Sequence, residues 1–108
     1  MLVTLLKAKI HNATVIDTNL NYEGSCAISE TLMEKLGIVE YEQLHICNKT
    51  NGKRFITYAI KYDSPESFVT LNGACARLAE PGDKVIICTY GLYSNTEEYA
   101  PNIATFGD

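Results

Sequence analysis

The sequence predicts a mainly β protein, in which many short strands close into a small barrel with only short helices between them. Runs of β-branched and aromatic residues recur along the chain, and Gly, Pro and Asn turn signals separate them. Only one stretch repeats its apolar residues clearly at helical spacing. Short strands at regular spacing are typical of a closed barrel. The length of 108 residues is that of one domain, so we expect a single domain over 1–108.

The composition supports a packed core and argues against several classes of protein. Hydrophobic residues make up 46% of the chain and charged residues 20%, which is a globular rather than a disordered balance. The net charge of −4 and the scattered basic residues argue against nucleic-acid binding. Apolar runs fall well short of the roughly 20 residues that cross a membrane, and the N-terminus lacks a signal-peptide core. We therefore expect a cytoplasmic protein, and a core this small favours an oligomer.

The cysteines are expected to be free thiols. None of them forms a C-x-x-C pair, and only two histidines could assist them, so a zinc site is poorly supported. Two disulfides are arithmetically possible, but free thiols are the better expectation without a secretory signal. The four are Cys26, Cys47, Cys75 and Cys88.

The first strands are expected over residues 2–10 and 13–17, with His11-Asn12 interrupting them. The turn-like stretch 19–21 then leads into Gly24-Ser25.

One helix is expected at residues 30–36. Ser29 is a good N-cap, Glu30 lies in the first turn where the helix dipole favours it, and Gly37 occupies the C-cap position. The apolar residues of this segment form one face: Leu32, Met33 and Leu36.

The second half of the chain reads as further strands and turns. Asn51-Gly52 is the strongest hairpin signal, because both residue types accept positive φ. Residues 72–78 open with a turn and allow one helical turn, and in the tail from Gly91 we expect Ile103 and Phe106 as anchors. The last expected strand, 85–90, is apolar enough to be buried on both faces. The remaining strands are expected at 44–47, 54–62 and 68–71.

Gly24-Ser25 is the stretch with the most distinctive chemistry. The pair can be only a turn, because glycine tolerates positive φ and serine bonds its own backbone. Polar or basic residues nevertheless interrupt strands that are otherwise apolar, and each alone has an ordinary structural explanation. Their combination is unusual: Lys9, His11, Tyr22, Arg54, Thr57, Tyr58 and Asn72.

With these residues in this order, the sequence resembles the pyruvoyl-dependent aspartate 1-decarboxylase family over nearly its whole length. The resemblance implies a six-stranded double-psi β-barrel and a homotetramer with active sites between subunits. The matching segments are Lys9-x-His11, Tyr22-Glu23-Gly24-Ser25-Cys26-Ala27-Ile28, Asn51-Gly52-Lys53-Arg54-Phe55-x-Thr57-Tyr58-Ala59-Ile60, Asn72-Gly73-Ala74 and Gly82-Asp83-x-Val85-Ile86-Ile87.

The resemblance also implies that the chain cleaves itself between Gly24 and Ser25, giving a β chain of residues 1–24 and an α chain of 25–108. The Ser25 hydroxyl would attack the Gly24 carbonyl, and the resulting ester would eliminate to leave a pyruvoyl group at position 25. Thr57 and Asn72 carry over as the residues that assist this shift.

The implied reaction converts L-aspartate to β-alanine and CO2, for pantothenate and coenzyme A biosynthesis. The pyruvoyl ketone would act as the electron sink through a Schiff base, without metal or pyridoxal phosphate. Tyr58 carries over as the proton donor, and Arg54 and Lys9 as cations for the substrate carboxylates. The expected pocket lining comprises Thr57, Gly73, Ala74 and Cys75, with His11, Tyr22 and Cys47 as pocket wall or supporting residues.

The chain departs from the family pattern at two pocket positions, where Cys47 replaces a frequent tryptophan and Cys75 a common alanine. Both changes alter volume rather than charge, so they affect pocket shape more than reaction type. The tail is shorter than in members whose C-termini meet a maturation factor, so we expect unaided maturation.

Three alternatives stay open. The chain could be a β-barrel binding module, such as a swapped-hairpin regulator, in which Gly24-Ser25 is only a turn. It could be a pyruvoyl enzyme for another amino acid, with Cys47 enlarging the pocket. Alternatively, the Cys26 thiol could attack the Ser25 carbonyl.

Overall fold

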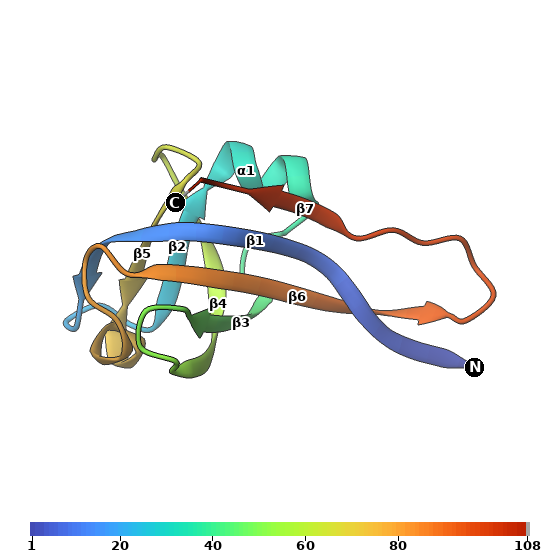
Figure 1. Cartoon of the computed structure of the whole chain (residues 1–108), viewed down its shortest axis with the longest axis horizontal. Helices are drawn as coiled ribbons and strands as arrows, with labels where there is room; N and C mark the ends of the chain where they lie inside the picture. Colours follow the sequence, from blue (N-terminus) through green and yellow to red (C-terminus); the bar gives the residue numbers. More distant parts are fainter. Residues whose placement is uncertain (108) are drawn as a thin grey trace.

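The computed structural model describes residues 1–107 as a strand-rich chain (Figure 1). Seven strands, one α-helix and one 3₁₀-helix are found in this part of the chain. Their bounds are β1 Leu2–Asn19, β2 Ser25–Ser29, α1 Glu30–Leu36, β3 Gln43–Asn48, β4 Arg54–Tyr62, β5 Phe68–Asn72, the 3₁₀-helix η1 Gly73–Leu78, β6 Lys84–Ser94 and β7 Asn102–Thr105.

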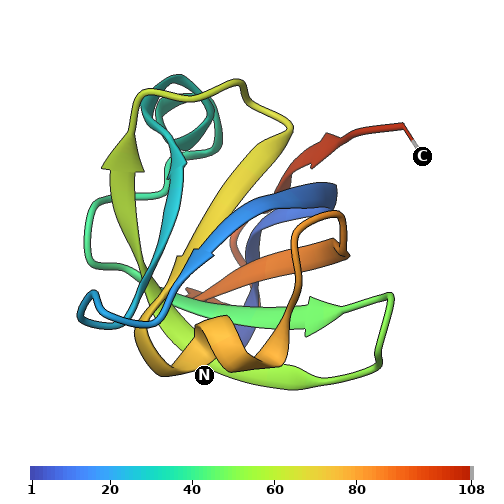
Figure 2. The same cartoon turned by 90° about the vertical axis from the view of Figure 1, so that its left-hand side faces the viewer.

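Six of these strands close into a barrel, which confirms the predicted fold class. The strands lie in the order β5-β2-β4-β3-β6-β1-β7, and an additional pairing of β5 with β1 completes the ring. Two pairings within the ring are parallel, β1 with β5 and β2 with β4, and the others are antiparallel. Figure 2 shows the strands surrounding the barrel interior. Strand β7 adds to β1 in parallel outside the ring.

The core fills the barrel with residues that alternate along the strands. Leu44 and Ile46 of β3 and Val85 and Ile87 of β6 are almost completely buried. The apolar face of α1 joins this core with Leu32, Met33 and Leu36. No helix within residues 1–107 is long and apolar enough to span a membrane.

Strand β1 is one continuous strand, so the predicted interruption at His11-Asn12 is wrong. The pairing with β6 shifts register between His11 and Ala13, which is a β-bulge, and Asn12 has a φ of 65°. The bulge is held by tertiary contacts, because the Asn12 amide donates to the Phe106 carbonyl at 3.3 Å and accepts from Lys49 Nζ at 2.5 Å. The strand therefore bends without ending.

The local signals for α1 and the hairpin are confirmed. The Ser29 hydroxyl accepts a hydrogen bond from the Leu32 amide at 3.2 Å, and Gly37 ends the helix with a φ of 71°. Strands β3 and β4 pair as the expected hairpin, but of the two turn residues only Gly52 has positive φ. Asn51 stabilises the turn through its side chain, which accepts from the Lys53 amide at 2.9 Å.

Strand β6 differs from the prediction in length and in burial. It continues to Ser94, and only the face with Val85 and Ile87 is fully buried. The opposite face carries half-buried Ile86 and an exposed Tyr90, so the expectation of burial on both faces is wrong. Apolar composition alone cannot distinguish a core position from an apolar position on an outer face.

The tail forms strand β7, which was not predicted, and one of its two predicted anchors fails. Phe106 packs against the core, as expected. Ile103 instead pairs with Lys9 of β1 on the outer side and is 54% exposed. Strand β7 is held by its backbone pairing with β1, by Ala104 and Phe106 against the core and by the Asn102 side chain, which donates to the Leu36 carbonyl. Ile103 does not contribute to this packing.

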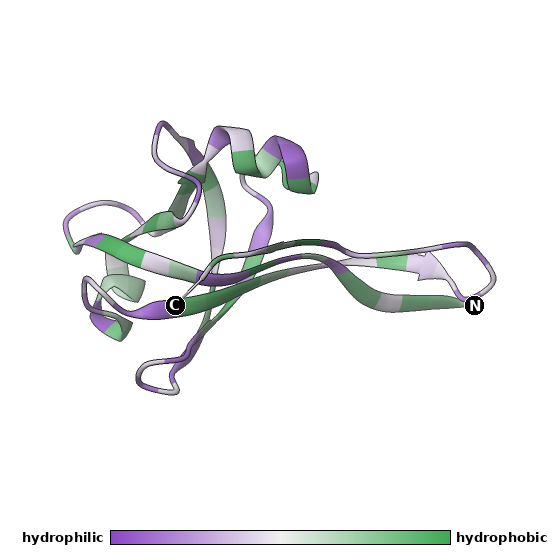
Figure 3. Ribbon diagram, turned by 45° about the horizontal axis from the view of Figure 1, so that its top comes forward, coloured by the Kyte–Doolittle hydropathy of each residue, from purple (hydrophilic) through white to green (hydrophobic). Residues whose placement is uncertain are grey.

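The N-terminal part of β1 and the C-terminal part of β6 extend beyond the barrel as a two-stranded arm (Figure 1). Leu2 and Leu92 on this arm are 65% and 68% exposed, and green, apolar stretches run along it in Figure 3. Exposed apolar surface of this kind is typical of a face that another molecule covers.

Candidate active site

Ser25 begins β2 directly opposite Asn72, the last residue of β5. The Asn72 side-chain amide donates to the Ser25 hydroxyl oxygen at 2.9 Å, and the two residues are only 3% and 4% exposed. The amide oxygen of Asn72 is buried and finds no hydrogen-bond partner among the described residues. The serine hydroxyl is thus held by a donor beside an unused buried acceptor.

The backbone of Gly73 fits closely against the residue before Ser25. Gly73 has a φ of 72°, and a Cβ placed on it would lie 2.7 Å from both the Cα and the nitrogen of Gly24. It would also lie 3.0 Å from the Tyr22 carbonyl oxygen. Only glycine allows the two backbones to approach this closely, so the Gly73 backbone packs directly against Gly24.

The Cys75 thiol contacts the backbone carbonyls of both Ser25 and Asn72. It donates to the Asn72 carbonyl at 3.0 Å and lies 3.7 Å from the Ser25 carbonyl oxygen. The Thr57 side chain is close enough to this thiol to lower its pKa, against the larger effect of burial. Burial raises the pKa of the Cys75 thiol, so it is a neutral donor at physiological pH. The structure therefore brings Ser25, Thr57, Asn72, Gly73 and Cys75 together, while Ala74 is exposed beside them.

Cys26 is a core residue with no exposed surface. Burial, and secondarily the Cys75 thiol, raise the pKa of Cys26 far above its ordinary value. A neutral thiol packed inside the barrel is a poor nucleophile. The structure therefore opposes the alternative in which Cys26 attacks the Ser25 carbonyl.

A cavity of about 180 Å³ opens on the outer side of the same strands. Tyr22, which is 64% exposed, and Asn72 contribute to its wall together with Ile60 of β4. Tyr58 lies two residues before Ile60 and therefore projects from the same face of β4. Its position on β4 is next to Ser25, because Ala59 pairs with Cys26 in the parallel ladder.

The predicted cations lie on the outer face of the sheet, Arg54 on β4 and Lys9 on β1, with β3 and β6 between these two strands. Arg54 pairs with Cys47 across the hairpin, and Lys9 pairs with Cys88. His11 pairs with Ile86 in the next row. We call this surface, with Lys9, His11, Arg54, Cys47 and Cys88, the cationic face.

A cavity of about 280 Å³ lies on the cationic face, with Cys47, Arg54 and Tyr90 in its wall. The Tyr90 ring meets the edge of His45 at 5.1 Å between ring centroids, and its hydroxyl lies close enough to the Cys88 thiol for each to influence the pKa of the other. Burial raises the pKa values of both Cys88 and Tyr90.

Sequence reasoning missed four residues of this face. The alternation of side chains along β3 and β6 could have identified them. They lie an even number of residues from Cys47 or Cys88, and so on the same face of their strand, or they pair with the predicted site residues of β1. They are His45, Ile86, Cys88 and Tyr90.

Within one chain the Ser25 cluster and Lys9 are far apart. By way of β4, β3 and β6, four interstrand steps of about 4.8 Å separate β2 from β1 by roughly 19 Å along the sheet. In the other direction only β5 lies between them, but that route reaches β1 at Asn19, which pairs with the Asn72 that lies opposite Ser25. Lys9 is ten residues from Asn19, or about 33 Å further along the strand. Both groups project outward from a closed barrel, which increases their separation. A ligand of amino-acid size could not touch both in one copy.

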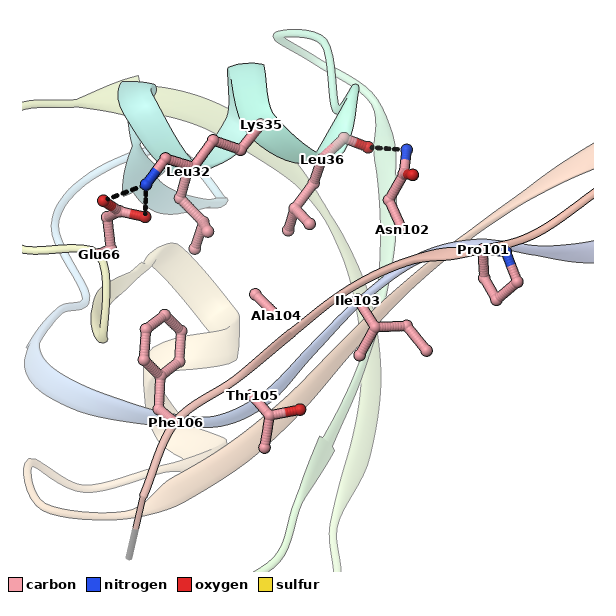
Figure 4. A pocket seen from close by; sticks show the side chains of 10 residues that line it. All are labelled: Leu32, Lys35, Leu36, Glu66, Pro101, Asn102, Ile103, Ala104, Thr105 and Phe106. Carbon is pink, nitrogen blue, oxygen red and sulfur yellow. Dashed lines mark hydrogen bonds and ion pairs between the residues drawn. The ribbon is translucent and has the colours of Figure 1, made fainter.

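A further groove of about 470 Å³ lies between α1 and β7 and holds none of the predicted site residues (Figure 4). Asn102 closes one side by donating to the Leu36 carbonyl at 3.0 Å, and Lys35 pairs with Glu66 at 2.9 Å on the other.

Comparison with known proteins adds family information. The aspartate decarboxylase family model matches residues 1–108. The chain is 52% identical over 97 residues to the aspartate 1-decarboxylase of Nitrosococcus oceani, covering 90% of this chain and 77% of that protein. It is 49% identical over 110 residues to that of Bacillus cytotoxicus, covering 100% and 87%. The computationally designed double-psi β-barrel msDPBB_sym2 superposes with a TM-score of 0.56 at 18% identity, over 81% of this chain and 99% of the design, which supports the fold alone.

Proposed function

Because the chain belongs to the aspartate decarboxylase family, we propose that it is an enzyme that converts L-aspartate to β-alanine and CO2 after cleaving itself at Gly24-Ser25. The family match over residues 1–108 supports the decarboxylation. The buried hydrogen bond from Asn72 to the Ser25 hydroxyl is the observation that supports self-cleavage. β-Alanine is the product that pantothenate and coenzyme A biosynthesis would consume.

The proposed cleavage starts with attack of the Ser25 hydroxyl oxygen on the Gly24 carbonyl carbon. The C–N bond breaks as the C–O bond forms, and the hydroxyl proton moves to the released amine, so the amide becomes an ester. Loss of the Ser25 α-proton then expels the Gly24 carboxylate and leaves dehydroalanine. One water converts dehydroalanine to a pyruvoyl group with loss of ammonia. The products are chains 1–24 and 25–108.

The residues around Ser25 suit this chemistry. Asn72 orients the nucleophilic oxygen through its side-chain N–H, and the amide oxygen of the same side chain is buried without a partner among the described residues. Gly73 limits the positions that Gly24 can adopt, which favours one approach of nucleophile to carbonyl. Thr57 lies close enough to Cys75 to influence the pKa of its thiol, so a second hydroxyl is present in the same cluster.

A pyruvoyl group at position 25 would supply a ketone as the electron sink for loss of the substrate carboxylate. Tyr58, on the neighbouring strand, is the residue we assign to deliver a proton to that carbon. Arg54 and Lys9 would bind the substrate carboxylates, because guanidinium and ammonium groups are the natural partners of a diacid.

Both sets of residues can act on one substrate only if two copies of the chain meet. Lys9 of one copy is about 19 Å along the sheet from its own Ser25. The cationic face also exposes apolar side chains, with Ile56 60% and Tyr90 45% exposed. These observations support an assembly, which we propose to be a homotetramer, in which the cationic face of one subunit meets the Ser25 cluster of its neighbour.

Denaturing mass spectrometry of the purified protein tests the proposal. We expect two fragments that divide between Gly24 and Ser25, the larger beginning with a ketone that hydroxylamine labels. Ser25→Ala should give one intact chain without aspartate decarboxylation, whereas Ser67→Ala should be processed normally. An intact wild-type chain after prolonged warming would contradict the proposal and favour a binding module.

Substrate preference provides a second test. L-aspartate should be decarboxylated much faster than L-glutamate, because two fixed cations select one separation of the carboxylates. Equal rates would refute the assignment of Arg54 and Lys9 to the substrate carboxylates.

A further inference from the structure

The cationic face carries two thiols whose chemistry the decarboxylation does not use. Cys47 lies on β3 and Cys88 on β6, in rows next to each other, and both are half-buried. Cys47 is close enough to Cys88 to contribute to the raised pKa of the Cys88 thiol. Residues diagonally opposite on neighbouring strands have Cα atoms about 7–8 Å apart, whereas a disulfide requires less than about 7 Å. The pair is therefore better placed to react with small molecules than to form a disulfide.

Each thiol has a cation as its cross-strand partner. Arg54 is directly opposite Cys47, and Lys9 is directly opposite Cys88. Side chains of directly opposite residues project from the same face about 5 Å apart. A negatively charged small molecule drawn to either cation would therefore arrive next to a sulfur atom.

The two thiols differ in their surroundings. Burial raises the pKa of the Cys88 thiol, which lies beside the Tyr90 hydroxyl. Cys47 lines the open cavity of about 280 Å³ together with Arg54. Cys47 is thus the thiol that a molecule in the cavity can reach.

We propose that Cys47 is a modification site for carboxylate-bearing electrophiles, which Arg54 and Lys9 attract and which the Cys47 sulfur attacks. With an α-haloacetate, the sulfur bonds to the methylene carbon, the carbon–halogen bond breaks, halide leaves with the electron pair, and the thiol proton passes to solvent. The S-carboxymethyl group that results places a carboxylate beside Arg54. It thereby occupies the position that a substrate carboxylate would take. This part of the inference rests on the proposed function, because it assumes that Arg54 and Lys9 bind the substrate carboxylates. Covalent attachment of an anion at Cys47 would then regulate the decarboxylation.

Iodoacetate and iodoacetamide test this proposal, because they alkylate the same thiol and differ mainly in charge. Peptide mapping gives the two alkylation rates at Cys47 in the full-length assembled protein and in urea. We expect the ratio of the iodoacetate rate to the iodoacetamide rate to be at least about threefold higher in the folded protein, as one favourable charge contact at a partly exposed site would produce. L-aspartate should slow the reaction with iodoacetate.

Matched variants identify the cation. Arg54→Gln should lower the rate ratio at Cys47 towards the value in urea, with Lys9 accounting for any preference that is left. Lys53→Gln removes the adjacent exposed cation in the hairpin turn and should leave the ratio unchanged. The same ratio in folded and unfolded protein, failure of both reagents to reach Cys47, or an equal effect of Lys53→Gln would overturn the proposal.

The experiment separates this inference from the proposed function. Decarboxylation with no charge preference at Cys47 contradicts only the modification site. A charge preference at Cys47 in a protein that neither cleaves itself nor releases CO2 contradicts only the proposed function. Rates measured on Ser25→Ala, which should remain uncleaved, show whether the anion preference exists before maturation.

Discussion

Gly73→Ala should separate the folding of the barrel from its self-cleavage. A Cβ at this position would lie 2.7 Å from the Gly24 Cα and nitrogen, whereas ordinary contacts begin near 3.4 Å. Because both contacted atoms belong to backbone, the Gly24 segment has to move by the difference, which is about 0.7 Å. Misplacement of reacting groups by about 1 Å can slow a reaction roughly 100-fold, so we expect cleavage to slow by about that factor.

The variant also carries a cost that has nothing to do with Gly24. A non-glycine residue in the left-handed region costs roughly 1–2 kcal/mol, which lowers the Tm of a domain of this size by about 4–16 °C. Gly52→Ala is the matched control, because Gly52 has a φ of 77° but a Cβ there meets no described atom within 4 Å. Gly52→Ala should therefore lose similar stability and still cleave at the wild-type rate.

The assay is a time course of precursor disappearance by denaturing mass spectrometry, combined with thermal unfolding of both variants. Equal cleavage rates for Gly73→Ala and Gly52→Ala would refute the role assigned to the close approach of Gly73 and Gly24. Slow cleavage in both would assign the effect to backbone strain instead.

Three further changes test other contacts. Asn72→Ala removes the donor to the Ser25 hydroxyl, so cleavage should slow by roughly 100-fold in the same assay; an unchanged rate would exclude this hydrogen bond from the mechanism. Burial raises the pKa of Cys26, so the folded state keeps a proton that the unfolded state loses above the ordinary value of 9.0. The free energy of unfolding, measured by urea titration, should therefore keep the full contribution of Cys26 below pH 9 and fall as pH rises above 9. The fall should be less steep in Cys26→Ala, and this variant should still cleave at Gly24-Ser25. Asp83→Ala removes the carboxylate that accepts from the Asn48 side chain and from the Glu80 amide, both at 2.9 Å, and leaves the Asn48 side-chain N–H groups with the Leu78 carbonyl at 3.2 Å. The change should cost about 1–3 kcal/mol in urea unfolding, and a loss below about 0.5 kcal/mol would show that solvent replaces the carboxylate.

Much of the local structure could be predicted because its causes are local. The helix at 30–36 depends on the Ser29 cap and the left-handed Gly37, and both act within one turn. The hairpin at Asn51-Gly52 similarly depends on a glycine that can adopt positive φ. The continuity of β1 could not be predicted, because the bulge at Asn12 is held by Lys49 and by Phe106, which is 94 residues away in the chain.

The sequence by itself determined that the chain forms a small β-barrel, and its motifs supplied a complete set of candidate site residues through the family resemblance. Only the tertiary structure decided how those residues are distributed. Strand order places the Ser25 cluster on one side of the barrel and the cationic face on another, because each residue's direction follows from its parity along a strand and its location from pairing between distant segments. Gly24-Ser25 could be recognised in the sequence, but its close contact with Gly73 follows only from the tertiary packing of η1 against the Gly24 backbone.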